Sequence, residues 1–290
     1  MSQASESLLG KRVRQGKDEV EETFKQAVSL TCGDRAENGP GMEQLGEMAS
    51  EGFTLEELKG AQKLFEDKGY KCEMIHLNEY LPDPLPEAKE MPEDAYFLII
   101  RQGLDTLLDD NKTGDDMYQE QMGLTPDKKA IFRGKVLNKN ARHNLCFGEE
   151  PQVAEYEKGK GTIVAYKDVP LLKGVRNKLP IFFGPKAEGL WVEGNYYYDP
   201  CKTGVSWHGD KERRKVIAIR LGASNPLCYH WFFQSKAIGR KVVVRLNHRD
   251  VYAMSAKAVG TDWGFRSKIT LRHAAGCKFY TDLKKKHKKE

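Results

Sequence analysis

Short apolar runs, separated by polar turns, dominate the chain from about residue 141 onward. Runs rich in β-branched and aromatic residues, bounded by Gly, Pro, Asn or charged residues, predict strands. The predicted strands are residues 162–166, 189–194, 215–221, 228–233, 240–246, 250–254 and 268–272. Strands at this spacing, with little helix between them, indicate an antiparallel sandwich or barrel such as a jelly roll.

The pattern before residue 100 is different. Thr54 and Glu57 form a capping box, an apolar stripe at helical spacing follows, and Gly69 is placed to end the helix. Residues 81–92 are rich in proline and predict an extended connector, and residues 95–100 predict a buried strand.

These patterns divide the chain into three parts. Residues 1–50 are rich in Glu, Lys, Gly and Ser, so we expect them to be weakly ordered. Residues 51–92 form the helical segment and the connector, and residues 93–290 form the main domain with a basic C-terminal tail. The expected fold class is α+β and mainly β, with N-terminal helices packed on the β core.

Composition narrows the function classes. The six cysteines are scattered and include no CxxC pair, which is atypical of a zinc ribbon or a disulfide scaffold. No apolar run is long enough to span a membrane and the first residues lack a secretory signal, so we expect a soluble protein of the cytoplasm or nucleus. The net charge of +5, part of it in the basic tail, permits a nucleic-acid partner without requiring one.

The most informative candidate chemistry is the pair His208 and Asp210. Residues two apart in an extended segment point to the same face, so an imidazole nitrogen and a carboxylate oxygen can reach one ion. With a second histidine from a distant strand they would make the two-histidine, one-carboxylate set of non-haem iron oxygenases, which leaves positions open on the metal. Arg213 and Arg214 follow the pair and are interpreted as a solvated turn.

The surrounding motifs resemble a known family. Asn195-x-Tyr197 precedes His208-x-Asp210, and the sequences Ile-Arg-Leu-Gly at 219–222 and Asp-Val-Tyr-Ala-Met at 250–254 follow. Over residues 190–276 this order resembles the Fe(II)/2-oxoglutarate dioxygenases, most of all the AlkB-like branch. The resemblance implies a double-stranded β-helix (jelly-roll or cupin-like) core, Fe(II) as the metal, and 2-oxoglutarate and O2 as cosubstrates.

The end of the chain carries a further similarity to this branch. Arg266, Lys268, Thr270 and Arg272 resemble the RxNxTxR strand of AlkB-like proteins, with Lys268 in place of Asn. The resemblance implies that Arg266 binds the distal carboxylate of 2-oxoglutarate, helped by Asn195 and Tyr197. It also implies that Arg272 lies near the carboxylate on the metal side.

The third metal ligand departs from the family pattern, because residues 254–265 contain no histidine. His273 is the first choice, Asp262 is the second, and a site without a third protein ligand is the other alternative. A strand cannot point Arg272 and His273 inward together without a bulge. If His273 is the ligand, the 2-oxoglutarate anchor is therefore Lys278 or Arg220.

Two functions from different classes follow. The first is an oxygenase that hydroxylates or demethylates its substrate, which the AlkB resemblance implies is a modified nucleic acid. A protein side chain or a small metabolite is the runner-up substrate for the same chemistry. The second is a non-catalytic jelly-roll binding protein that has lost the metal.

Overall fold

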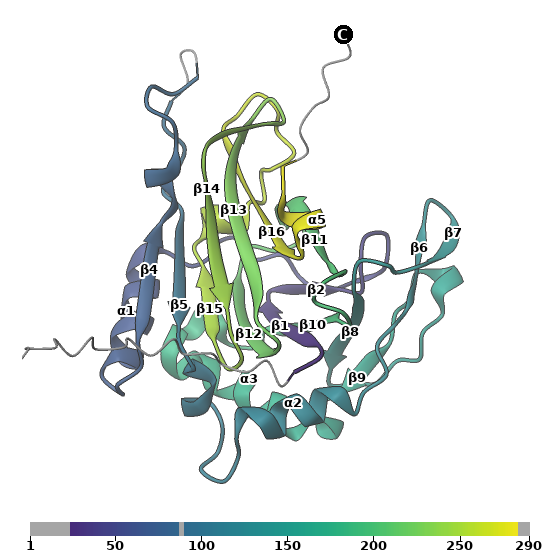
Figure 1. Cartoon of the computed structure of the whole chain (residues 1–290). Coiled ribbons are helices and arrows are strands. Elements are labelled where there is room, and N and C mark those ends of the chain that lie inside the picture. Colours follow the sequence, from purple (N-terminus) through teal and green to yellow (C-terminus); the bar gives the residue numbers. More distant parts are fainter. Residues whose placement is uncertain (1–23, 87–89, 284–290) are drawn as a thin grey trace, which may run out of the picture.

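Two sheets of strands face each other, and helices cover the outer side of the larger one (Figure 1). The computed structural model describes residues 24–86 and 90–283. The protein is mainly β, and the core between the two sheets contains Val216, Tyr252 and Met254 of the larger sheet and Tyr229 and Trp231 of the smaller one. The expectation of a mainly β chain is therefore confirmed.

The larger sheet has eight strands, and its neighbours are antiparallel except for the last pair, β8 with β9. In spatial order the strands are β4 (Cys72–His76), β5 (Tyr96–Ile100), β15 (Val251–Met254), β12 (Val216–Gly222), β1 (Ala27–Gly33), β10 (Trp191–Tyr197), β8 (His143–Gly148) and β9 (Ile163–Ala165). The smaller sheet is antiparallel throughout, in the order β11 (Gly204–His208), β16 (Thr270–Gly276), β13 (Asn225–Phe233) and β14 (Lys236–Leu246).

Two hairpins and several helices complete the described chain. The hairpins pair β2 (Arg35–Glu37) with β3 (Gln44–Gly46), and β6 (Lys129–Phe132) with β7 (Lys135–Asn138). The α-helices are α1 (Leu55–Glu66), α2 (Gly114–Met122), α3 (Pro170–Phe183), α4 (Ala256–Val259) and α5 (Lys278–Thr281). The 3-10 turns are η1 (Leu77–Tyr80), η2 (Gly103–Thr106), η3 (Tyr156–Lys158), η4 (Tyr166–Asp168) and η5 (Pro185–Ala187).

The expectation of weak order up to residue 50 is wrong for β1. This strand lies between β10 and β12 near the middle of the larger sheet, and all seven of its residues are buried. Val28 and Leu30 pack in the core on the helix side, whereas Ser29 and Thr31 point the other way and line a cavity between the sheets. The strand was not predicted because the residues on either side of it are polar, although both of its faces are covered in the structure. Residues 1–23 lie outside the described part of the chain.

The expected boundary after residue 92 does not separate two sheets. The proline-rich connector joins β4 to β5, and these strands pair from Cys72 opposite Ile100 to His76 opposite Tyr96. The segment 51–92 is thus built into the same sheet as the rest of the chain. The basic tail from residue 284 onward lies outside the described residues.

The capped helix is confirmed as α1. Thr54 accepts a hydrogen bond from the Glu57 backbone, the Glu57 carboxylate accepts one from the Thr54 backbone, and Leu58, Ala61 and Phe65 are buried against the sheet. The prediction of little helix among the later strands is wrong at α3. That helix begins at Pro170, a favourable first position, and buries Leu172, Val175 and Leu179. Among the described residues, no helix is long and apolar enough to cross a bilayer.

Candidate metal centre

His208 is the last residue of β11, and a bulge brings it opposite His273 of β16. The register runs from Gly204 opposite Gly276 through Val205 opposite Ala275, and shifts before His208 pairs with His273. An extra residue in one strand turns the following side chain to the other face. The extra residue lies in β11, so it turns His208, whereas β16 keeps a regular register with β13. On β16, His273 lines the cavity between the sheets and its neighbour Arg272 does not, so of these two residues it is His273 that faces the cavity.

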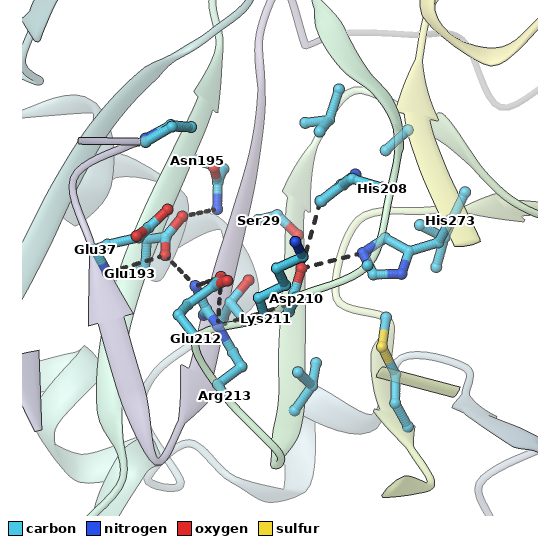
Figure 2. Close-up of a pocket in the computed structure, with 18 of the residues that line it drawn as sticks. Ser29, Glu37, Glu193, Asn195, His208, Asp210, Lys211, Glu212, Arg213 and His273 are labelled. Atoms are coloured by element: carbon cyan, nitrogen blue, oxygen red, sulfur yellow. Dashed lines mark hydrogen bonds and ion pairs between the residues drawn. The ribbon is translucent and has the colours of Figure 1, made fainter. Parts of the chain in front are cut away.

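The side chains of His208, Asp210 and His273 converge (Figure 2). Asp210 Oδ1 lies 3.4 Å from His208 Nε2 and 3.4 Å from His273 Nε2. Two ligand atoms roughly 2.1 Å from one ion and at right angles to each other lie roughly 3 Å apart. The three side chains thus have the chemistry and almost the spacing of a set that shares one ion.

The tautomer of His208 suits a metal ligand. Its Nδ1 lies 2.7 Å from the Ser206 carbonyl oxygen, and a carbonyl only accepts, so Nδ1 carries the proton. This leaves the lone pair on Nε2, the atom that faces Asp210. A backbone carbonyl behind a ligating imidazole is a usual way to fix the orientation of the ring.

The electrostatic surroundings keep Asp210 charged. Burial works against ionisation, but the contacts with His208 and His273 and the charge of Arg213 hold the pKa of its carboxyl well below the usual range. Burial and the neighbouring His208 lower the pKa of His273, which favours the neutral imidazole. A carboxylate beside a neutral imidazole is the protonation state that binds a divalent cation.

A ring of charged side chains surrounds Asp210 on the side away from the histidines. Arg213 Nη2 lies 2.6 Å from Glu193 Oε2 and 3.0 Å from Glu212 Oε1, and Arg213 Nε lies 3.7 Å from Asp210 Oδ2. The expected solvated turn is wrong for Arg213, which is 3% exposed. One signal in the sequence could have indicated this burial. Glu193 lies two positions before Asn195 on the same strand, so it faces the same side as Asn195 and could pair there with a buried arginine.

The three side chains border a cavity of about 620 Å³. Strands β1 and β10 contribute Ser29, Thr31 and Glu193, and the β2–β3 hairpin contributes Arg35 and Glu37. None of these residues was a candidate from the sequence. Four of them lie in the segment that was expected to be weakly ordered, and Glu193 lies in a predicted strand but outside the motifs that were recognised. A cavity of this size accommodates a small ligand or one extended side group.

Comparison with known proteins supplies one relative. An uncharacterized protein of Acanthamoeba polyphaga mimivirus is 42% identical over 256 residues, which cover 88% of this chain and 97% of the viral protein. The chain belongs to the family of this mimivirus protein. No family model matches the sequence.

In the present chain, two of the four predicted cosubstrate residues line the cavity and two do not. Asn195 and Tyr197 line the cavity, and Asn195 accepts hydrogen bonds from Arg142 and, at 2.9 Å, from Asn144. Arg266 is exposed and precedes β16, which begins only at Thr270, so the alternation expected from residue 266 onward does not apply to it. Arg272 packs over the rings of Phe232 and Trp263, outside the cavity lining.

The alternative candidates also differ in position. Asp262 Oδ2 lies 2.6 Å from Lys257 Nζ, and Asp262 is not part of the converging cluster. Lys278 is exposed on α5. Arg220 is 1% exposed, on the inner face of β12 with its guanidinium over the Tyr197 ring.

Proposed function

We propose that this protein is an Fe(II)- and 2-oxoglutarate-dependent oxygenase whose iron is held by His208, Asp210 and His273. The observation that carries the proposal is the convergence of two imidazole Nε2 atoms on one carboxylate oxygen, 3.4 Å from each. Two histidines and one carboxylate beside an open cavity are typical of non-haem iron oxygenases. Bound iron would supply the oxidising chemistry, while the chain holds the cosubstrate and the substrate beside it.

We also propose that the two facing sheets form a jelly roll. Strands β10, β1, β12 and β15 form an antiparallel set that faces the antiparallel sheet of β11, β16, β13 and β14. Eight antiparallel strands in two facing sheets suit a jelly roll, or double-stranded β-helix. The central strand β1 would then be supplied by the N-terminal segment, whereas the other seven follow one another from residue 191 onward.

Arg220 is the residue best placed to bind the distal carboxylate of 2-oxoglutarate. Among the described residues, no carboxylate lies within ion-pair distance of its guanidinium, and its Nε is buried without a hydrogen-bond partner. A buried cation without a counter-charge is costly, and a bound anion would offset that cost. Ser29, Tyr197 and Tyr252 lie around it and line the cavity, so the guanidinium lies directly behind the cavity lining, and these three side chains separate it from the metal side.

A modified nucleic acid is the substrate class favoured by the surface beside the cavity. The β6–β7 hairpin and its flanks carry Lys128, Lys129, Arg133, Lys135, Lys139 and Arg142, with no Asp or Glu between residues 128 and 142. Phe132 and Leu137 on the hairpin are 48% and 50% exposed. Basic side chains interleaved with exposed apolar ones are typical of surfaces that bind single-stranded nucleic acid. The hairpin projects beside β8 (Figure 1), and Arg142 lines the cavity.

The decisive experiment measures succinate formation from 2-oxoglutarate by the protein reconstituted anaerobically with Fe(II) and then exposed to air. The wild type is expected to turn over, and His208→Ala is expected to lose activity by more than about 100-fold. His76→Ala, a histidine paired with Asp94 away from the cavity, is the matched control and should retain activity. Candidate single-stranded DNA, RNA, peptide and metabolite substrates are then compared by how far each stimulates turnover. No turnover under any of these conditions would favour the non-catalytic binding protein.

A further inference from the structure

Arg213 is a buried guanidinium in contact with three carboxylates beneath the candidate metal centre (Figure 2). The side chains of Arg213 and Glu193 are only 4% and 5% exposed, and their 2.6 Å contact joins the loop after β11 to β10. An arginine guanidinium keeps its proton in proteins, and this one faces the carboxylates of Glu193, Asp210 and Glu212. The arginine is therefore a fixed positive charge next to a proposed ligand.

The N-terminal segment holds this arginine in place. Gly33 ends β1 where a Cβ would lie 2.8 Å from the Lys215 carbonyl oxygen and 3.1 Å from Arg213 Cδ, so a larger residue would crowd the loop. The next residue, Asp34, accepts hydrogen bonds from the backbone N–H groups of Arg214 and Lys215 at 2.9 and 2.8 Å. The backbone directly after Arg213 is thus anchored, as expected for a side chain that must keep one orientation.

The two oxygens of Asp210 have different environments as a result. Oδ1 faces both histidines, each at 3.4 Å, whereas Oδ2 faces Arg213 Nε at 3.7 Å. A cation beside Oδ2 competes with a metal ion for that oxygen but leaves Oδ1 available. A carboxylate free of such a neighbour could bind an ion through both oxygens.

We propose that Arg213 is a positioning residue that restricts Asp210 to binding the metal through Oδ1 alone, and that Glu193 is the counter-charge that makes this arginine compatible with a nearby cation. The inference rests on the proposed metal site. One-oxygen binding leaves one more coordination position for exogenous ligands than two-oxygen binding does. Without Glu193, the positive charge of Arg213 would oppose metal binding.

The test is a Co(II) titration of the apo protein, followed by the visible absorption spectrum, which reports coordination number. Arg213→Met is expected to alter the spectrum toward higher coordination, with Arg213→Lys intermediate, and Glu193→Gln is expected to weaken Co(II) binding by about 10- to 100-fold. Arg101→Met, which breaks a buried ion pair with Asp250 away from the cavity, should change neither. Circular dichroism and thermal unfolding show which variants are folded.

The outcomes distinguish a failure of the role proposed for Arg213 from a failure of the proposed metal site. A folded Arg213→Met variant with wild-type spectrum and affinity would overturn the positioning role and leave the metal site intact. If Arg213→Met does not fold, Glu193→Gln gives the answer, and wild-type Co(II) affinity in that variant would equally overturn the inference. A wild type that binds no Co(II), Fe(II) or Zn(II) would overturn both this inference and the proposed function.

Discussion

His208 on β11 and His273 on β16 lie directly opposite each other, with ring centroids 4.4 Å apart. The two residues are 65 positions apart in the chain. A bulge in the pairing of β11 with β16 is what aligns them, because without it His208 would face the position of Arg272. The candidate site therefore depends on a local irregularity in the smaller sheet.

The third ligand can be tested by comparing two substitutions. His273→Ala is expected to lower Fe(II) or Co(II) affinity by more than about 100-fold, because it removes a converging nitrogen. Asp262→Ala is expected to leave the affinity unchanged, because the Asp262 carboxylate pairs with Lys257 instead. Isothermal titration of the apo proteins measures both. Metal loss in Asp262→Ala with retention in His273→Ala would reverse the assignment.

The cosubstrate anchor is tested by the KM for 2-oxoglutarate. Arg220→Met is expected to raise it by about 100-fold, since truncating one partner of a buried charge pair costs about 2–5 kcal/mol. Arg266→Met is the matched control, and its exposed side chain outside the cavity predicts an unchanged KM. The opposite pattern would restore Arg266 as the anchor.

The role of β1 in the core predicts a large stability effect near the N-terminus. Leu30 is fully buried among both strands and helices, so Leu30→Ala is expected to lower the free energy of unfolding by about 2–5 kcal/mol. Leu64 on α1 is 44% exposed, and Leu64→Ala should cost less than about 1 kcal/mol. Urea denaturation distinguishes the two, and equal small effects would contradict the central position of β1.

The basic hairpin predicts salt-dependent binding of single-stranded oligonucleotides. Replacing both Lys128 and Lys135 by Glu is expected to weaken binding at least about tenfold and to lower the salt dependence, because each lost phosphate contact removes about 0.7 from its slope. The control replaces Lys59 and Lys63 on the exposed face of α1 by Glu, with the same change in charge. Fluorescence anisotropy measures both. Equal weakening by the two pairs would mean that only net charge matters.

His248 predicts a pH-dependent contribution to stability. Its Nδ1 accepts a hydrogen bond from the Gly222 backbone at 2.9 Å, and burial lowers its pKa from the ordinary 6.5. The unfolded chain therefore takes up a proton that the folded one resists, so stability is lost as pH falls through about 6.5. Burial raises the pKa of Glu212 to about 7, which acts in the opposite direction. The measurement is thus a difference: His248→Gln should lose less thermal stability than the wild type between about pH 7.5 and 5.5.

Local patterns predicted much of the fold. The capping box of Thr54 and Glu57 and the apolar runs of β5, β12, β13 and β15 are signals carried by adjacent residues, and each became the expected element. Strand β1 was missed because Ser29 and Thr31 face a cavity and are polar, so the run lacks a uniform apolar pattern. Its buried state follows only from pairing with β10 and β12, which is a long-range effect.

The candidate site was predictable to a similar extent. His208 and Asp210 are two residues apart and could be paired by strand geometry, whereas His273 was only the first of three alternatives for the third ligand. Arg266 was misplaced because the strand begins later than its residue pattern predicts, at Thr270. The roles of Arg213 and Glu193 depend on a contact between β10 and the loop after β11, which no spacing in the sequence specifies.

The most direct test of the metal centre is an anomalous diffraction measurement on crystals grown anaerobically with Fe(II), recorded on both sides of the iron absorption edge. We expect one peak per chain, about 2.1 Å from His208 Nε2, Asp210 Oδ1 and His273 Nε2. A peak elsewhere, or no iron peak in crystals of the wild type soaked to saturation, would contradict it.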